Sequence, residues 1–282
     1  PFIALTATAT PEVVIDIQEK LLFKKPNIIQ KSFLRSNLSY VVRRTENQVS
    51  SMLKVIDGAR GSGIVYTTTR KRTKEIAHLL QQHGLKADFY HAGLSSEERQ
   101  TKQHSWIHNK TQIIVATNAF GMGMDIPDVR LVFHWHHPPS VEDYAQEFGR
   151  AGRDGKQSLA VVFTKKDDEN LLNFMAEKSV GDSKIPGQAK ALALDKVKES
   201  IQKIKTFANQ RDHCFNQLLL EELGSATKSI PRLSKFFLNL AFAKRQKRER
   251  RNFCCDGCWR KKHSGHATNF ARDVVERMGV HQ

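Results

Sequence analysis

The sequence contains few of the residues that hold secreted scaffolds together or cross a membrane. It has only four cysteines among 282 residues, and three of them fall together at positions 254, 255 and 258. This distribution is unlike a framework of disulfides, and it favours metal ligation in a reducing compartment. No run of apolar residues approaches the length that crosses a bilayer. These absences argue against a disulfide-stapled domain and against an integral membrane protein.

Acidic residues are also scarce relative to basic ones. The chain carries 29 Asp and Glu against 45 Lys and Arg, a formal net charge of +16 at pH 7. The excess is concentrated in the last third, as in the run KRQKRERR from Lys244 to Arg251. A basic protein that is merely soluble is compatible with this balance. The concentration of charge nevertheless favours a surface that binds a polyanion, of which nucleic acid is the commonest.

Short apolar runs alternate with amphipathic stretches over the first 165 residues. Apolar content rich in β-branched residues predicts six strands, at residues 38–43, 63–68, 87–91, 112–117, 130–135 and 159–164. Helix start signals lie between them. Ser95 and Glu98 form a capping box, Ser140 is placed as an N-cap, and Pro11 suits a first helical position. Apolar strands separated by helices predict an α/β fold, with a parallel sheet covered by helices on both faces.

The character of the sequence changes after about residue 165. Helical periodicity without a convincing strand runs from residue 167 to 242, as in ALALDKVKESIQKIKTF, with a loop around residues 181–187. We therefore expect three parts, at residues 1–25, 26–165 and 166–282. The abrupt start PFIALTATAT, which lacks an initiator Met, leads us to expect that the chain is a piece of a longer protein.

Three glycine-containing segments follow or lie between the predicted strands. YHAGLSSEER follows the strand that ends near His91, VATNAFGMGMDIP follows the one that ends near Thr117, and EFGRAGRDG begins at Glu147. We expect all three beyond the carboxyl ends of the strands, where open α/β sheets bind ligands. Glycine lets a backbone approach a ligand closely, and Arg150 and Arg153 share a helix face. Each segment alone is compatible with an ordinary turn.

In order and spacing, these segments resemble the motifs of superfamily 2 helicases. The blocks are ALTATA, GIVYTTTRKRTKEIAHLL, ADFYHAGLSSEER, IIVATNAFGMGMDIPDVR and YAQEFGRAGRDG, and they are most similar to those of RecQ DNA helicases. The resemblance is strong over residues 1–180 and continues weakly to residue 260 through the cysteines. It implies the C-terminal half of a helicase core. Residues 1–25 would end a first RecA-like domain, residues 26–165 would form the second, and residues 166–282 would be a helical, zinc-binding region.

One motif of the family's core is absent from this sequence. No G-x-x-x-x-G-K-[ST] phosphate-binding loop occurs in the chain, and in the family this loop and the acidic Mg²⁺ motif belong to the first domain. We therefore expect ATP and Mg²⁺ to bind mainly through a domain that this chain lacks. By itself the chain is expected not to hydrolyse ATP.

The resemblance also implies roles on the nucleotide side. Arg153 matches an arginine finger, which stabilises charge on the transferring phosphoryl group, and Arg150 matches a phosphate contact or a coupler between domains. Gln146 would link the nucleotide to the DNA side. Gly123 and Asp125 would face the nucleotide cleft, although Asp125 is equally compatible with an aspartate that caps a helix. The other reading of the two arginines is that they are solvated helix residues.

Further positions match those that hold single-stranded DNA in this family. They are Arg70, His91, Gly93, Thr117, Thr6 and Thr8. Hydroxyls and bare amides suit phosphate oxygens, because they bind them without reading the base sequence. The segment of Thr6 and Thr8 resembles the motif that couples the ATP state to the grip on DNA. A plain turn at the end of a strand is its other interpretation.

The cysteines resemble the family's zinc ligands only in part. The family uses one helical cysteine followed by C-x-x-C-x-x-C, whereas Asn252 stands at the first position of that cluster here. The candidate ligands are Cys214, Cys254, Cys255 and Cys258, with His213 or His263 as substitutes. Four such ligands would complete a tetrahedral Zn²⁺ site if adjacent cysteines can both reach the metal. Because adjacent ligands strain that geometry, cysteines without metal are the alternative.

The function implied by the resemblance is ATP-dependent unwinding of DNA with 3′→5′ polarity, in DNA repair and recombination. Such an enzyme is classed as a hydrolase and an isomerase. Its partners would be single-stranded and forked duplex DNA and no membrane, and it would act as a monomer. It would lie in the nucleus of a eukaryote or in the cytoplasm and nucleoid of a bacterium. Two alternatives stay open: a superfamily 2 RNA helicase, and a nucleic-acid-binding module without activity of its own.

Overall fold

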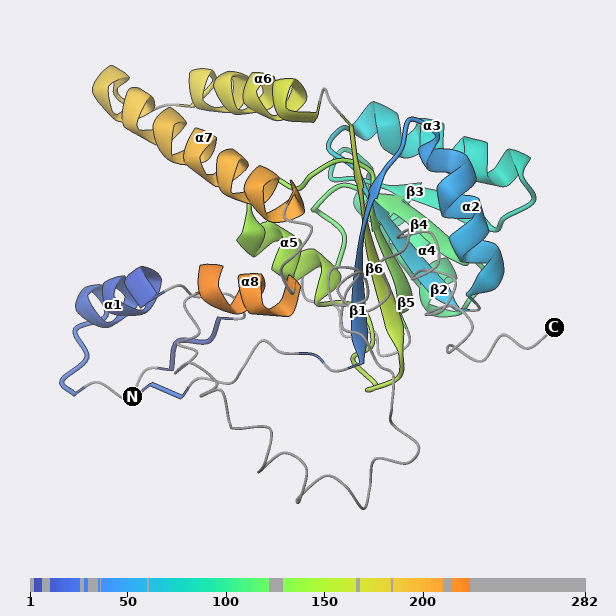
Figure 1. Ribbon diagram of the computed structural model, residues 1–282, viewed down its shortest axis with the longest axis horizontal. Coiled ribbons are helices and arrows are strands. Elements are labelled where there is room, and N and C mark those ends of the chain that lie inside the picture. The colour runs from blue at the N-terminus through green and yellow to red at the C-terminus, as the bar shows by residue number, and fades with distance from the viewer. Residues whose placement is uncertain are drawn as a thin grey trace, which may run out of the picture.

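A single parallel sheet forms the centre of the molecule. The computed structural model describes residues 3–6, 11–25, 28–29, 35, 37–59, 61–121, 129–165, 168–183, 185–209 and 215–223. The strands are β1 (Leu38–Arg44), β2 (Ser62–Tyr66), β3 (Ala87–Tyr90), β4 (Ile113–Ala116), β5 (Val129–His134) and β6 (Ser158–Thr164). They are ordered β1-β6-β5-β2-β4-β3, and every neighbouring pair is parallel (Figure 1). The six predicted strands and the parallel sheet are confirmed.

Helices cover both faces of this sheet, which explains why its strands are apolar on both sides. On one face, α2 (Gln48–Gly58) and α3 (Arg70–Gln82) pack an apolar cluster that includes Met52, Leu80 and Phe133. On the other face, α4 (Ser96–Ile107) and α5 (Val141–Phe148) contribute to a second cluster around Trp106 and Phe120. Every residue of β5 and of β6 is buried.

The helices next to the glycine-containing turns begin where the sequence predicted. Ser95 Oγ accepts a hydrogen bond from the Glu98 N–H at 3.1 Å, and Glu98 Oε2 accepts one from the Ser95 N–H at 2.8 Å. Ser140 Oγ accepts from the Asp143 N–H at 3.0 Å and so caps α5. Helix α1 (Pro11–Lys20) begins at the predicted proline and lies away from the sheet, at the left of Figure 1.

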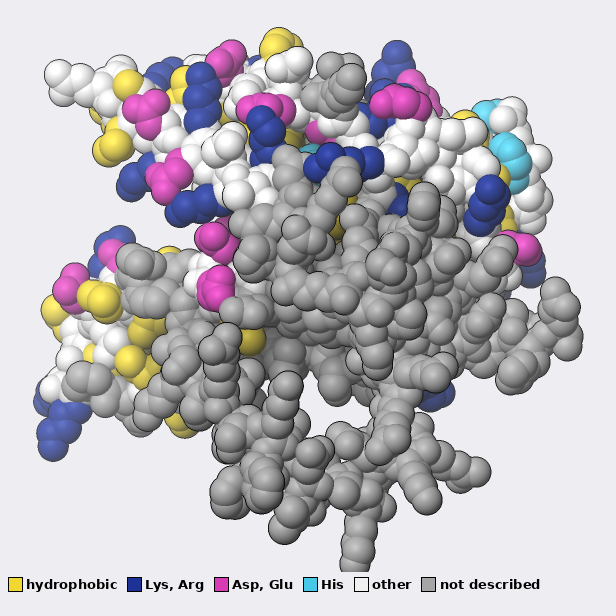
Figure 2. Space-filling model, viewed as in Figure 1, with side chains coloured by type: hydrophobic (Ala, Val, Ile, Leu, Met, Phe, Trp, Pro, Cys, Tyr) yellow, Lys and Arg dark blue, Asp and Glu magenta, His cyan; other side chains and the backbone are white. Residues whose placement is uncertain are grey.

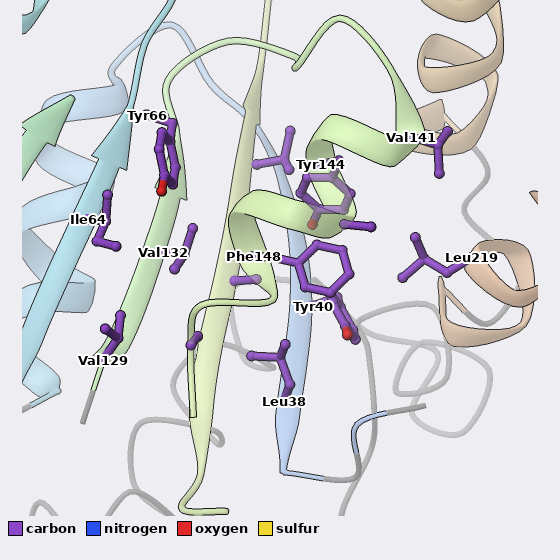
Figure 3. Packing of buried hydrophobic residues seen from close by; sticks show 14 of the residues in the cluster. Leu38, Tyr40, Ile64, Tyr66, Val129, Val132, Val141, Tyr144, Phe148 and Leu219 are labelled. Atoms are coloured by element: carbon purple, nitrogen blue, oxygen red, sulfur yellow. The ribbon is translucent and has the colours of Figure 1, made fainter. Parts of the chain in front are cut away.

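Only helices occur in the described residues beyond 165, as predicted. Helices α6 (Asp168–Gly181) and α7 (Gly187–Asn209) form a hairpin that buries Leu172, Ala176 and Ile201. Helix α8 (Phe215–Glu222) packs on α5 (Figure 3).

Figure 3 also shows how α5 is seated on the sheet. The ring of Phe148 lies edge-on to that of Tyr40 on β1, with 4.9 Å between centroids, and Leu219 of α8 lies beyond them. The turn that follows α5 is therefore anchored to the core.

The face of the α6–α7 hairpin in Figure 2 mixes basic and acidic side chains. Lys198 pairs with Glu177 at 3.0 Å and Lys203 with Glu199 at 2.9 Å. The basic charge of this hairpin is therefore partly offset by neighbouring carboxylates. None of the helices in the described part of the chain is long and apolar enough to span a bilayer.

Candidate functional site

The three glycine-containing segments lie at two different edges of the sheet. The turn after β3 and the loop after β4 begin at the carboxyl ends of the strands, which we call the carboxyl edge. Residues 149–157 instead lead into β6 at the opposite, amino edge. There the Gly152 N–H donates to the carbonyl of Val129, the first residue of β5, at 2.9 Å. The expectation that EFGRAGRDG lies beyond the carboxyl ends is wrong, because α5 carries the chain back along the sheet before β6 begins.

The arginine turn (residues 149–156) carries Arg150 and Arg153 at this amino edge. Arg150 is half-buried, and its Nη1 donates a hydrogen bond to the carbonyl oxygen of Gly121. Gly121 has a φ of +95°, and a Cβ built on it would lie 2.6 Å from Arg150 Cζ. Arg153 is exposed, while Gln146 is exposed on α5 one turn before Arg150. The close approach of a guanidinium to bare backbone therefore explains the glycine at position 121.

The loop after β4 is held firmly on its way to Arg150. Phe120 is fully buried, with its ring centroid 5.1 Å from that of Trp106, and its carbonyl accepts a hydrogen bond from Tyr66 Oη at 3.3 Å. Burial raises the pKa of Tyr66, and the positive charge of Arg150 opposes this rise. The Tyr66 hydroxyl therefore stays a neutral donor at physiological pH.

A second arginine braces the far side of the arginine turn. Arg130 forms an ion pair with Asp154 and donates to Ser158 Oγ at 3.0 Å. Burial alone would raise the pKa of Asp154, but hydrogen bonds from the Lys156 N–H and from Arg130 bring it below its usual range. Asp154 is therefore ionised at neutral pH and suited to this pairing.

At the carboxyl edge, the structure brings Arg70 and Gly93 together. Arg70 is the first residue of α3, and the preceding residue, Thr69, caps that helix by accepting from the Arg72 N–H at 3.2 Å. A Cβ on Gly93 would lie 2.8 Å from Arg70 Nη1, so the guanidinium rests on the bare turn after β3. Both residues are exposed.

His91 lies in the same turn, at the carboxyl end of β3. Its side chain is buried, and neither ring nitrogen has a hydrogen-bond partner among the described residues. Burial, followed by the positive charge of Lys74, lowers the pKa of His91. The imidazole is therefore neutral near pH 7, and both of its nitrogens are buried. Thr117 follows β4, where its N–H donates to the Tyr90 carbonyl at 3.3 Å.

Sequence reasoning missed three histidines, one at the end of β5 (His134) and two in the segment between β5 and α5 (His136 and His137). His134 Nε2 lies 2.9 Å from Glu147 Oε2 in a buried pair, and His136 Nδ1 lies 3.0 Å from Asp168 Oδ1. The second pair ties the sheet domain to α6. Together with Thr117 and residues of α6 and α7, the histidines line a cavity of about 390 Å³. The run HWHHPP was the available signal, because it begins at the last residue of a strand.

Several predicted site residues lie outside the part of the chain that the structure describes. They are Thr8, Gly123, Asp125, Cys214, Cys254, Cys255 and Cys258, and also the substitute ligands His213 and His263. Thr6 is described and exposed. Within the described ranges, no group of three or more His, Cys, Asp or Glu side chains is placed to hold a metal ion.

Comparison with known proteins gives the class of this domain. A family model described as the helicase conserved C-terminal domain matches residues 47–155, which contain both carboxyl-edge turns and all but the last residue of the arginine turn. Among solved structures, a variant of Saccharomyces cerevisiae Dbp5 bound to RNA and ADP BeF3 has the same fold. It aligns with a TM-score of 0.50 and 20% identity, over 70% of this chain and 54% of that one. The sheet and its turns are those of a RecA-like helicase C-terminal domain.

Relatives in sequence narrow the family further. RecQ-like DNA helicase blm-1 of Caenorhabditis elegans is 44% identical over 182 residues, which cover 63% of this chain and 18% of that protein. A protein of Acanthamoeba polyphaga mimivirus named as an ATP-dependent RNA helicase is 38% identical over 232 residues, 81% of this chain and 40% of that protein. The chain thus spans less than half the length of these relatives. Its residues 47–155 match the helicase C-terminal domain, and the chain is similar to RecQ-like superfamily 2 helicases at 35–44% identity.

Proposed function

We propose that this chain supplies the second RecA-like domain of an ATP-dependent 3′→5′ DNA helicase. Residues 1–25 would end the first RecA-like domain, and residues 166–282 would form a helical, zinc-binding continuation. The observation that carries the proposal is the loop from Thr117 to Gly121. This loop begins at the carboxyl edge beside the turn after β3, and its last residue, Gly121, contacts Arg150 of the arginine turn. One short segment would therefore join two ligand surfaces.

The arginine turn is proposed to face ATP. Arg153 is exposed and permanently charged, as an arginine that reaches a phosphoryl group held by another domain must be. The family's first domain would hold ATP and Mg²⁺, which supply the phosphoryl group and the first part of its charge neutralisation. Arg153 would stabilise the charge that develops in the transition state. Arg150, with Gln146 one turn earlier on α5, would transmit the state of the nucleotide to the loop after β4.

The carboxyl edge is proposed to hold the backbone of single-stranded or forked DNA. Arg70 supplies a charge, Thr117 supplies a hydroxyl, and Gly93 leaves the backbone open to a phosphate, while neutral, buried His91 would support the turn that carries Gly93. Such contacts bind every base sequence alike and weaken as salt rises. Closure over ATP and reopening after hydrolysis would then move this edge along the strand, in a helicase that acts as a monomer.

The test uses the full-length protein that contains the phosphate-binding domain. We expect Arg153→Ala to lower ATP turnover by roughly 10³-fold or more while DNA affinity is nearly unchanged. Arg70→Ala should instead weaken DNA binding. A loss of turnover smaller than about threefold in Arg153→Ala would contradict the finger, because the expected loss is far larger.

An RNA substrate is the second candidate, because one relative is named as an RNA helicase. Strand displacement on DNA and RNA duplexes of matched sequence separates the two. We expect unwinding of the DNA duplex with a 3′ single-stranded tail, and preferential unwinding of RNA would overturn the choice of DNA.

A further inference from the structure

We infer that Arg35 is a positioning residue for the arginine turn, and that it holds Arg150 and Arg153 in register for phosphoryl transfer. The inference rests on the proposed function, in which Arg153 is the finger. Arg35 lies outside the sequence blocks that resemble helicase motifs, three residues before β1.

The guanidinium of Arg35 binds three carbonyl groups of the arginine turn. Nη2 donates to the carbonyl oxygens of Ala151 at 2.9 Å and of Gly152 at 2.7 Å, and Nη1 lies 3.4 Å from that of Gly149. Gly149 directly precedes Arg150, and Ala151 and Gly152 lie between Arg150 and Arg153. The carbonyls belong to the peptide group just before Arg150 and to the two peptide groups before Arg153, whose orientation is thus fixed from outside the turn.

An arginine suits this place for two physical reasons. The last carbonyls of a helix have no partner within it, and a positive charge at that end interacts favourably with the helix dipole. Gly149 caps α5, so its carbonyl lies at such an end. A guanidinium presents several donors in one rigid plane, and one side chain can therefore bind several carbonyls at once. The single ammonium of a lysine cannot reproduce that fork.

Neighbouring contacts leave the turn little freedom to rearrange. Asn37 Nδ2 donates to the Gly152 carbonyl at 2.8 Å and to the Lys156 carbonyl at 2.9 Å. Gly152 has a φ of +59°, and a Cβ on it would lie 2.5 Å from Asn37 Nδ2. The clamp formed by Arg35 and Asn37 therefore closes one side of the turn, while the Arg130–Asp154 pair closes the other.

Such a clamp affects catalysis because a finger works only from the right place. Misplacing a group by about 1 Å can cost on the order of 100-fold in rate. Loss of Arg35 should let the turn shift, so ATP turnover should fall while the ATP and DNA surfaces stay intact. A residue that merely stabilises the fold would lower the amount of folded protein instead.

The experiment compares four variants of the full-length protein: Arg35→Ala, Arg35→Lys, Arg153→Ala and the control Gln48→Ala. Gln48 is buried, and its Nε2 donates to the Trp135 carbonyl at 2.8 Å, so the control removes the same kind of bond away from the turn. We measure kcat and KM for ATP, the Kd for single-stranded DNA, and amide hydrogen exchange of residues 149–157. Arg35→Lys keeps the positive charge but lacks the several donors of the guanidinium. It replaces Arg35→Ala as the test variant if Arg35→Ala fails to fold.

We expect Arg35→Ala to lower kcat by about 10- to 100-fold, with KM and Kd within about threefold of wild type. Exchange should rise over residues 149–157 in Arg35→Ala and not in Gln48→Ala, and Arg35→Lys should recover little of the loss. Adding Arg35→Ala to Arg153→Ala should cost little more, since both act through one group.

Two results would overturn the inference and leave the proposed function standing. One is a kcat for Arg35→Ala equal to that of Gln48→Ala while Arg153→Ala is strongly impaired. The other is a full additional loss in the double variant, which would show that Arg35 acts other than through the finger. Normal turnover in Arg153→Ala would overturn the proposed function, and the inference with it.

Discussion

The guanidinium of Arg150 donates a hydrogen bond to the carbonyl oxygen of Gly121, and this bond joins the arginine turn to the loop after β4. The loop starts at Thr117, at the carboxyl edge of the sheet, and Phe120 is buried in the core between them. Because the loop is anchored along its length, displacing one end should displace the other. The contact between Arg150 and Gly121 is therefore where coupling between the two surfaces can be tested.

The first prediction concerns Gly121→Ala, with Gly84→Ala as its control. Both glycines have positive φ, +95° and +80°, so an alanine at either site should cost about 1–2 kcal/mol of folding free energy. Only at Gly121 would the new Cβ displace Arg150, since nothing lies within 4 Å at Gly84. In the full-length protein, we expect DNA-stimulated ATP turnover to be at least tenfold lower in Gly121→Ala than in Gly84→Ala. Equal turnover in the two variants would show that the Arg150 contact carries no coupling.

The second prediction concerns Gly93→Ala, with Gly181→Ala as its control. A Cβ on Gly93 would meet the mobile end of Arg70, whereas nothing lies within 4 Å of one on Gly181. The fold should accept both changes, but Gly93→Ala should move Arg70 off its phosphate. Affinity for single-stranded DNA, measured as a function of salt, should then drop, and the slope of log K against log salt should shrink by about 1. If Gly93→Ala and Gly181→Ala had the same DNA affinity and the same salt slope, Arg70 and Gly93 would not belong to the DNA-binding surface.

The third prediction concerns pH and His137, which is buried where the sheet meets α6. Burial lowers its pKa to about 4; the charge of Asp168 opposes this shift, while His134, His136 and Arg44 add to it. The unfolded chain therefore takes up the proton first, so stability should be full above about pH 6.5 and fall as pH drops toward 4. Between pH 7.5 and pH 5 this amounts to about 2 kcal/mol.

Urea unfolding of wild type, His137→Gln and the exposed control His78→Gln checks this prediction. His137→Gln should lose about 2 kcal/mol less than wild type over that pH range, and His78→Gln should behave as wild type. An identical pH dependence for all three proteins would show that His137 is not the group responsible.

The elements of the sheet domain could be predicted because each has a local signal. Strands such as β5 and β6 are apolar throughout, and Ser95 with Glu98 caps a helix through contacts within four residues. The edge of the sheet at which the arginine turn lies depends on the direction in which α5 crosses the sheet. No local sequence pattern predicts that direction. The clamp from Arg35 and the pairing of His136 with Asp168 likewise join segments distant in sequence. A single arginine before a strand has no periodicity to mark it.

The last prediction concerns the zinc site that the sequence predicts, whose candidate ligands lie outside the described part of the chain. If thiolates of Cys214, Cys255 and Cys258 with Cys254 or a histidine bind the metal, the purified chain should carry about one Zn²⁺ per molecule. Cys258→Ser should lower that content, and comparison of Cys254→Ser with Cys255→Ser should show which adjacent cysteine is a ligand.

Because a structural zinc site contributes folding free energy, chelation should loosen the region after residue 165 and spare the sheet domain. The basic run from Lys244 to Arg251 lies between the ligands in sequence, so it should become the first site of tryptic cleavage. The zinc site would be ruled out if protein purified without chelators held no zinc and this run were equally resistant to trypsin in Cys258→Ser. The proposed helicase function would remain, since it rests on the arginine turn and the carboxyl edge.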